Sequence, residues 1–286
     1  MIPIISFNIL TREYYNKYDS DKNINNDFRK RFIFFLLNKW TTSELKPLIA
    51  LQEVTGEWKD DIEKIFINNG YNYFSMNYGF RGNGYFGVVS AVPKKYKVLD
   101  INYINIPNLF KNNSNLIQEE IIDDLLKTNH FLIQLILKDT KPFIFYNYHL
   151  PVPKNESINQ IIHAVTLKKL MCNMKNYPII WAGDFNIKPD SEIYNFIKKN
   201  RITLKIKNIE FPDCNLEFES SYKSFHGSEP IMTTHTKFFK DTLDYIFITN
   251  DFKCINSKVL QYNEEIMPNK YNPSDHLPLI SLLVLN

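Results

Sequence analysis

Hydrophobic residues along this chain form short apolar runs that alternate with longer stretches of mixed apolar and polar character. The short runs are rich in Ile, Val, Phe and Tyr, which is typical of buried strands. Apolar residues at every third or fourth position predict helices, and Gly70 closes one of these. The predicted strands cover residues 2–10, 47–53, 85–92, 131–137, 143–149, 178–182, 244–249 and 277–285, and the predicted helices cover residues 26–40, 57–69, 158–173 and 191–199.

The stretch between residues 105 and 129 has a weaker pattern. Residues 105–115 (NIPNLFKNNSN) look like an exposed loop, and residues 118–127 (QEEIIDDLLK) look like a short helix. Overall, strands and helices are interleaved without the strict alternation of an all-parallel sheet. Length leaves open one large domain or two small ones. A two-sheet sandwich flanked by helices, as a single domain over residues 1–286, fits this mixture.

Composition narrows the class of protein. The net charge is +3, from 34 basic and 31 acidic residues, so the chain lacks the basic excess of a protein that coats nucleic acid. An enzyme that binds a few nucleotides needs only a local basic groove, so the net charge does not exclude a nucleic-acid substrate. Cys172, Cys214 and Cys254 are far apart and lack CxxC spacing, which predicts reduced thiols.

The sequence pattern predicts no targeting segment and no membrane-spanning segment. The apolar N-terminus is too short for a signal sequence, and no apolar run is long enough to span a bilayer. We therefore expect a cytoplasmic or nuclear protein that does not enter membranes.

Polar side chains stand where several predicted strands end. In Gly183-Asp184-Phe185-Asn186, alternation puts Asp184 and Asn186 on one side and turns Phe185 inward. A carboxylate beside an amide could orient a water and hold a phosphate oxygen. An Asx turn at the strand end explains the same residues equally well.

Two further strand ends carry acids. Asp275 and His276 precede the last apolar run, where a carboxylate could hold the imidazole protonated. A loop with a surface His is the plainer explanation. Glu53 ends the strand PLIALQE and could supply a carboxylate to magnesium, which prefers one or two of them. A solvated surface Glu is again the simpler alternative.

The remaining polar positions lie on or at the ends of strands. His149 ends the run FIFYNYH, and Asn8 lies on the first strand with Ile5, Phe7 and Ile9 on the opposite face. Asp244 interrupts a β-like run, so it needs a partner if it is buried, and a His would be the natural one. Each position is weak evidence alone. Together they supply the side chains of a metal-dependent phosphoryl site, and no Walker loop, GxSxG, HExxH or GxGxxG motif competes with them.

In this order the segments resemble the endonuclease/exonuclease/phosphatase superfamily. The matching segments are SFNIL at 6–10, LQEV at 51–54, NYHL at 147–150, GDFN at 183–186, LDYIF at 243–247 and SDHLPL at 274–279. The resemblance implies a four-layer α/β sandwich, in which two packed mixed sheets are flanked by helices, with the site at one rim of the sheets.

One branch resembles this chain further: the deadenylase, nocturnin, angel and 2′,5′-phosphodiesterase group. The match rests on GDFNIKPDSEIYNFI at 183–197 and on residues 221–245. It implies that Phe239 stacks on a substrate base, although Phe is also a common core residue. His235 stands where the group usually has Asn, which puts its predicted substrate contact in doubt. Gln160 and His163 stand where the group often has Arg and Gln.

The resemblance also implies a role for each residue. Glu53 would be the main ligand of Mg²⁺, with Mn²⁺ as an alternative ion, and Asn8 and Asp275 would lie nearby. Asp184 would deprotonate the attacking water, and Asn186 would fix its position and touch the phosphate. His276, held by Asp244, and His149 would stabilise the transition state from opposite sides.

The main function that the resemblance implies is that of a 3′-end exoribonuclease, which acts on single-stranded RNA or oligoadenylate. Alternatives are a phosphatase or phosphodiesterase acting on a small nucleotide, a lipid phosphodiesterase, and an inactive binding module that kept the fold. A monomer is expected. The sequence names no protein partner.

Overall fold

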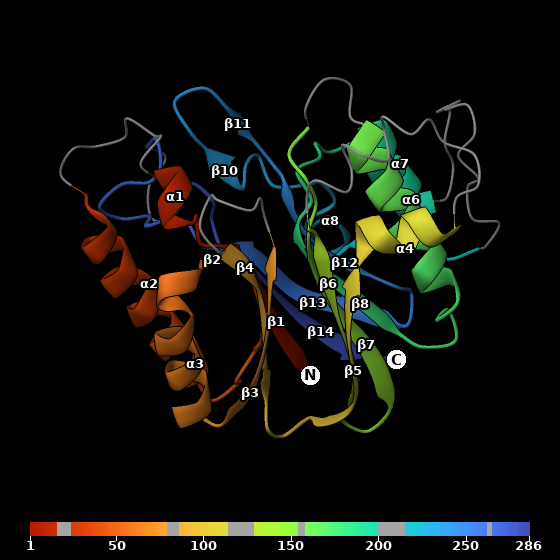
Figure 1. Ribbon diagram of the computed structural model, residues 1–286. Helices are drawn as coiled ribbons and strands as arrows, with labels where there is room; N and C mark the ends of the chain where they lie inside the picture. The colour runs from red at the N-terminus through yellow and green to blue at the C-terminus, as the bar shows by residue number, and fades with distance from the viewer. Residues whose placement is uncertain (16–23, 79–85, 114–128, 154–157, 200–214, 262–264) are drawn as a thin grey trace.

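Two six-stranded β-sheets pack face to face and carry helices on their outer faces (Figure 1). The computed structural model describes residues 1–15, 24–78, 86–113, 129–153, 158–199, 215–261 and 265–286. No helix in these ranges has the length and apolar character needed to cross a membrane.

The first sheet has the strand order β13-β14-β1-β2-β4-β3, and β14 from the end of the chain pairs with β1 from its start. Only β1 and β2 are parallel neighbours in it. Its strands are β1 (Ile2–Asn8), β2 (Leu48–Thr55), β3 (Tyr71–Tyr78), β4 (Phe86–Pro93), β13 (Phe252–Val259) and β14 (Leu279–Leu285).

The second sheet has the order β5-β6-β7-β8-β12-β9, with β7 and β8 as its parallel pair. A short two-stranded ribbon, β10 (Thr234–His235) with β11 (Lys240–Asp241), stands apart from both sheets. The strands of the second sheet are β5 (Lys97–Asn105), β6 (Phe131–Lys138), β7 (Pro142–His149), β8 (Ile179–Asp184), β9 (Glu219–Ser220) and β12 (Asp244–Ile248).

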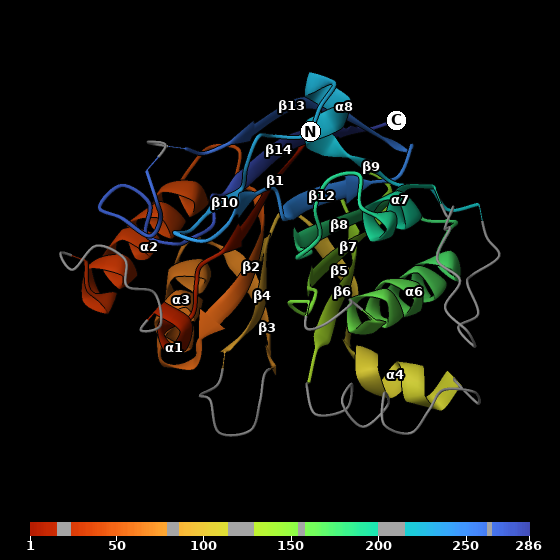
Figure 2. The same ribbon diagram turned by 90° about the horizontal axis from the view of Figure 1, so that it is seen from above.

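Helices complete the outer layers. On the first sheet lie α2 (Asn26–Thr41) and α3 (Lys59–Asn68), and on the second lie α4 (Ile106–Asn113), α6 (Ile158–Cys172) and α7 (Glu192–Lys199) (Figure 2). Shorter elements are α1 (Arg12–Tyr15), a 3₁₀ turn (Gly56–Trp58) and α8 (Ser221–His226).

Three apolar clusters hold these layers together. One fills the space between the sheets, with Ile4 and Leu48 from the first sheet and Phe145 and Ile180 from the second. The other two join each sheet to its own helices. Burial of apolar surface on both faces of each sheet is the main stabilising contribution to such a sandwich. The four-layer α/β fold predicted from the resemblance is confirmed.

The predicted loop over residues 105–115 is wrong, because α4 begins there. The Asn105 side chain caps the helix by accepting a hydrogen bond from the Asn108 N–H at 2.9 Å. Pro107 is tolerated in the first turn, where the helix has no use for its missing N–H. Ile106 and Phe110, one turn apart, are buried against α6. The helix predicted over residues 118–127 lies outside the described ranges.

The cysteine prediction also needs correction. Cys172 is disulfide-bonded, and Cys254 is a free, buried thiol. The disulfide contradicts the expectation of reduced thiols, which was one ground for predicting a cytoplasmic or nuclear location. Wide spacing in the sequence does not exclude a bond, because the fold sets the distance between two cysteines.

Candidate active site

Parallel strand pairs bring the polar strand ends to one rim of the sandwich. Asn8, the last residue of β1, lies beside Gln52 of β2, and His149, the last residue of β7, lies beside Asp184 of β8. Asp244, the first residue of the antiparallel β12, also pairs with Asp184. Because parallel strands end at the same edge of a sheet, these side chains gather without any long loop.

A bulge aims Glu53 at this rim. The pairing of β2 with β4 shifts register between Leu51 and Val54, and Glu53 has φ of 54°. Leu51 and Val54 both pack in the cluster under α2 and α3, which strict alternation would forbid. The extra residue turns Glu53 away from the face that alternation would assign to it. A non-glycine residue at positive φ is strained, as is common at functional sites.

The GDFN segment depends on a close approach of two strands. A Cβ at Gly183 would lie 1.8 Å from the carbonyl oxygen of Tyr148, so only glycine fits there. Asn186 follows at φ of 50°, a region that Asn tolerates better than most residues. Gln160 of α6 donates from Nε2 to the Asn186 carbonyl at 2.8 Å and fixes this turn.

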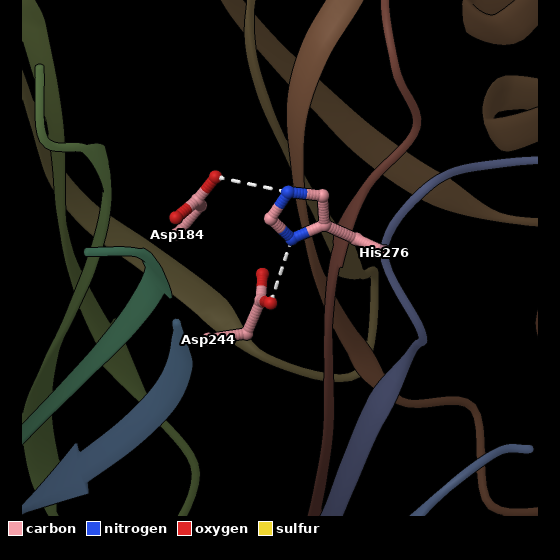
Figure 3. A group of neighbouring side chains, drawn as sticks. All are labelled: Asp184, Asp244 and His276. Atoms are coloured by element: carbon pink, nitrogen blue, oxygen red, sulfur yellow. Dashed lines mark hydrogen bonds and ion pairs between the residues drawn. The ribbon is translucent and has the colours of Figure 1, made fainter. Parts of the chain in front are cut away.

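An imidazole lies between two carboxylates at the centre of the rim (Figure 3). His276 Nδ1 donates to Asp244 Oδ2 at 2.8 Å, and its Nε2 lies 3.6 Å from Asp184 Oδ2. Thr233 also donates to Asp244 Oδ2, at 2.6 Å. Although burial acts to lower it, the two carboxylates raise the pKa of His276 well above its usual value. His276 is therefore protonated at neutral pH, and the predicted His partner of Asp244 is present.

The second histidine of the rim carries no charge. Burial lowers the pKa of His149. Asp184 acts to raise this pKa and the nearby His276 acts to lower it further, and the net shift is downward. Asn186 donates from Nδ2 to His149 Nε2 at 3.0 Å and to the Leu150 carbonyl at 2.9 Å. His149 Nε2 also lies 3.4 Å from Asp184 Oδ2. Two histidines on either side of one carboxylate thus hold opposite protonation states.

Glu53, Asn8 and Asp275 form the oxygen-rich side of the site. Asn8 donates from Nδ2 to Glu53 Oε1 at 3.2 Å and to Asp184 Oδ2 at 3.0 Å, so it links these two carboxylates. The Thr11 N–H donates to Glu53 Oε2 at 3.1 Å. Burial and the charge of Asp275 raise the pKa of Glu53 to about 7. A divalent cation would relieve this crowding of buried carboxylates, and hard oxygen ligands suit Mg²⁺, so the residues fit such an ion.

Asp184, Asp244 and His276 also offer ligand atoms within 4.8 Å of one another. Asp244 and His276 are already hydrogen-bonded to each other, and a metal at this group would have to break that bond. The side with Glu53 and Asp275 therefore fits a metal ion better, although either group of side chains could hold one.

One cleft of about 730 Å³ opens onto the rim. Apolar side chains make up part of its lining, among them Val152, Pro153, Ile187 and Phe239. Thr234 and Thr236 line it, whereas His235 between them does not, so the cleft gives the predicted substrate contact of His235 no support. The predicted residues that line the cleft are Glu53, Asp184, Asn186, Phe239, Asp275 and His276, and those that support them from behind are Asn8, His149 and Asp244.

The sequence profile of the endonuclease/exonuclease/phosphatase family matches residues 6–276, which reach from the first rim strand to His276. The chain belongs to this family. Its fold agrees with solved structures of low sequence identity. The crystal structure of ANGEL2, a 2′,3′-cyclic phosphatase, in complex with adenosine-2′,3′-vanadate superposes with a TM-score of 0.76 at 18% identity, covering 99% of this chain and 95% of that one. The human nocturnin catalytic domain superposes with a TM-score of 0.72 at 21% identity, covering 100% and 93%.

Curated relatives match only parts of the chain. The CCR4-Not complex 3′-5′-exoribonuclease subunit Ccr4 of Aspergillus terreus is 30% identical over 118 residues, which is 36% of this chain and 17% of that protein. Human 2′,5′-phosphodiesterase 12 is 27% identical over 179 residues, or 57% of this chain and 29% of that protein. The chain thus spans less than a third of the length of these relatives.

The motifs used to recognise the family pass over Arg29, which the structure places directly behind the site. This α2 residue is fully buried and donates to the carbonyls of Pro273, at 2.6 Å, of Ile9, at 2.8 Å, and of Leu10. Burial lowers the pKa of Arg29 to about 10, so it stays charged at neutral pH. Arg29 ties the segment after Asn8 to the segment before Asp275. Its one sequence signal is a basic residue on the otherwise apolar face of a helix.

Replacing Arg29 by Lys should weaken metal binding about 10-fold, the usual effect of losing a residue that orients ligands. Lys keeps the charge, but its single ammonium group cannot bond all three carbonyls in the planar arrangement of a guanidinium. Isothermal titration with Mg²⁺ measures this directly. Arg12→Lys is the control, since Arg12 is exposed and pairs with Glu57. An unchanged Mg²⁺ affinity in Arg29→Lys would show that Arg29 does not position the ligands.

Proposed function

We propose that this chain is a divalent-metal-dependent phosphodiesterase that removes nucleotides from the 3′ end of single-stranded RNA, as a single catalytic domain over residues 1–286. One observation supports this most: an acidic oxygen cluster, an imidazole held between two carboxylates and the Phe239 ring share one cleft. Hydrolysis of a phosphodiester needs a base for water, positive charge at the phosphoryl oxygens and a surface for the nucleotide.

Each rim residue has a part in this reaction. Asp184 accepts the proton of the attacking water, and its position is fixed by hydrogen bonds from Asn8 Nδ2 and from the Asn186 N–H at 2.9 Å. Protonated His276 donates to a non-bridging phosphoryl oxygen, and Asp244 keeps it protonated. His149 and the Leu150 carbonyl hold the Asn186 amide through its Nδ2, so its oxygen is the atom that can accept a hydrogen bond from the attacking water and fix its position. None of these residues forms a covalent bond to the substrate.

Glu53 and Asp275, with Asn8 beside them, would hold Mg²⁺ or Mn²⁺. A bound divalent ion would polarise the phosphoryl oxygen and stabilise the leaving alkoxide.

Phe239 is the proposed contact for a base. It lines the cleft, and Lys188 Nζ lies 5.1 Å from the centre of its ring. A ring face beside a cation suits a nucleotide, because the base stacks on the ring and the phosphate meets the positive charge. The match to a 3′-5′-exoribonuclease supports RNA as the substrate. We propose that the enzyme acts as a monomer.

A second candidate is cleavage of 2′,5′-linked oligoadenylate. It is favoured by the match to 2′,5′-phosphodiesterase 12, which extends over 57% of the chain. Both linkages place a phosphodiester beside an adenosine, so the same cleft could serve either.

Incubation with 3′-labelled and 5′-labelled oligoadenylate, 2′,5′-oligoadenylate and NADPH in Mg²⁺ tests these proposals. We expect early release of the 3′ label as mononucleotide, with progressive shortening of the 5′-labelled strand, and no reaction in EDTA. Preferred cleavage of the 2′,5′ linkage would support the second candidate. Hydrolysis of NADPH alone would replace both by a small-nucleotide phosphatase, and no hydrolysis of any substrate would remove the enzymatic proposal.

A further inference from the structure

Helix α2 carries a row of three phenylalanines at the edge of the face that it buries, and Phe32 still packs against the core cluster. Phe28, Phe32 and Phe35 lie along one side, with ring centroids 6.1 Å and 6.4 Å apart. Phe35 is 59% exposed, whereas Ile33, on the inward side of the same helix, is fully buried. Phe28 and Phe32 are half-buried, so each keeps part of its ring accessible beside the exposed Phe35. Adjacent apolar side chains that stay accessible on a surface mark an interaction site more often than isolated ones do.

A groove of about 530 Å³ runs beside this face, lined by Phe28, Arg31, Phe32 and Lys270. Arg31 and Lys270 are both exposed, and neither forms an ion pair with another described residue. Among the described residues, those that line the groove include no acidic side chain. Two cations beside aromatic rings are complementary to a ligand that carries both negative charge and flat rings.

The groove and the cleft share one short segment, residues 266–275, because Lys270 lines the groove and Asp275 lines the cleft. The Met267 N–H bonds the His235 carbonyl at 2.8 Å, and Asn269 and Asn272 bond each other through their backbones. Arg29, next to Phe28, anchors the segment at Pro273. Lys270 and Asp275 are five residues apart, so their Cα atoms are separated by at most about 18 Å.

We propose that this groove binds the 5′ portion of a single-stranded RNA whose 3′ end occupies the cleft. The inference rests on the proposed function and adds a second contact region to it. Bases stack on the Phe28, Phe32 and Phe35 rings, and Arg31 and Lys270 neutralise phosphates of the same strand. A strand that leaves the cleft needs only a few nucleotides to cross the segment that the two regions share. The enzyme therefore binds longer strands more tightly than short ones.

The test measures binding without turnover, in an Asp184→Asn background. Fluorescence anisotropy gives the affinity for oligoadenylates of about 4 and about 16 nucleotides, the range of single-strand site sizes. The groove variant carries Arg31→Glu and Lys270→Glu, both at exposed positions that leave the core intact. The control carries Lys97→Glu and Lys138→Glu, which change the net charge equally. Lys97 and Lys138 are paired at the opposite end of the second sheet from His149.

The measured quantity is the ratio of the affinity for the long strand to the affinity for the short strand. We expect this ratio to be about 10-fold lower in the groove variant and unchanged in the control. Two lost phosphate contacts should lower the slope of log affinity against log salt by 0.7 × 2, or about 1.4, for the long strand. An equal long-to-short ratio in the two variants would overturn the proposal. The proposed function would then still stand if the intact chain cleaves the short strand, and it would fall separately if no strand is cleaved.

A further measurement separates RNA from a second copy of the chain as the occupant. The groove variant should have the same mass in solution as the intact chain. A change of mass, with the preference for long strands retained, would assign this face to contacts between copies and would also overturn the proposal.

Discussion

Replacing Asp184 by Asn should lower turnover roughly 10³-fold, as expected when a general base is lost. The amide cannot accept the proton of water at neutral pH. It keeps the shape of the carboxylate, and its oxygen can still accept one of the hydrogen bonds from Asn8 and Asn186. Removing a charge that is buried beside Asp244 also limits any loss of stability. Circular dichroism and thermal melting should match the intact protein, while labelled oligoadenylate should be cut roughly 10³-fold more slowly.

Asp190→Asn is the matched control. Asp190 lies six residues further along, is exposed, and has φ of 61°, which Asn also adopts readily. Its turnover should equal that of the intact protein. Near-normal turnover in Asp184→Asn would remove Asp184 as the base and with it the proposed mechanism.

Replacing Glu53 by Gln should raise the Mg²⁺ concentration needed for half-maximal activity at least about 100-fold, beyond what loss of an orienting partner costs. Glu53 supplies a buried charge that Gln lacks, although Gln can still bond Asn8 and the Thr11 N–H. Mg²⁺ raises the melting temperature of a protein that binds it only when folded. The intact protein should show this rise, and Glu53→Gln should not.

The dependence on pH provides an independent check. The raised pKa of Glu53, about 7 instead of 4.5, means that the folded, metal-free protein binds more protons than the unfolded chain between these values. Stability in EDTA should therefore fall as pH rises from 4.5 to about 7. Below about pH 7, Mg²⁺ must displace the proton bound to Glu53. The affinity of the protein for Mg²⁺ should therefore decrease as the pH is lowered. Glu53→Gln should lack both effects, whereas Glu63→Gln, at an exposed position on α3, should keep them. Identical pH profiles in all three proteins would contradict the assignment of Glu53.

Much of the fold follows from local patterns. Apolar runs identified the strands that build the centre of each sheet, because a strand buried on both faces must be apolar throughout. Among the longer strands, β3, β5 and β13 were missed, and so were the two-residue strands β9, β10 and β11. β5 shows why: its sequence KVLDINYIN is largely exposed at a sheet edge, so no buried face imposes a pattern on it.

The site was recognised from the residue types at strand ends. The number of residues between them does not predict how far apart they lie in space. Asp244 and His276 are 32 residues apart, yet they share a hydrogen bond of 2.8 Å because β12 begins at the rim that the last loop crosses. The family resemblance supplied this pairing, and alternation alone could not have done so.

By itself the sequence determined the apolar layers, the polar strand ends and, through its motifs, the family. Only the tertiary structure decided how these parts meet. A bulge turned Glu53 toward Asp184, a buried Arg29 joined two segments that are far apart in sequence, and α4 formed where local composition favoured a loop. The physical reason is the same in each case: hydrogen bonds and burial between distant residues outweigh the weak preferences of a local segment.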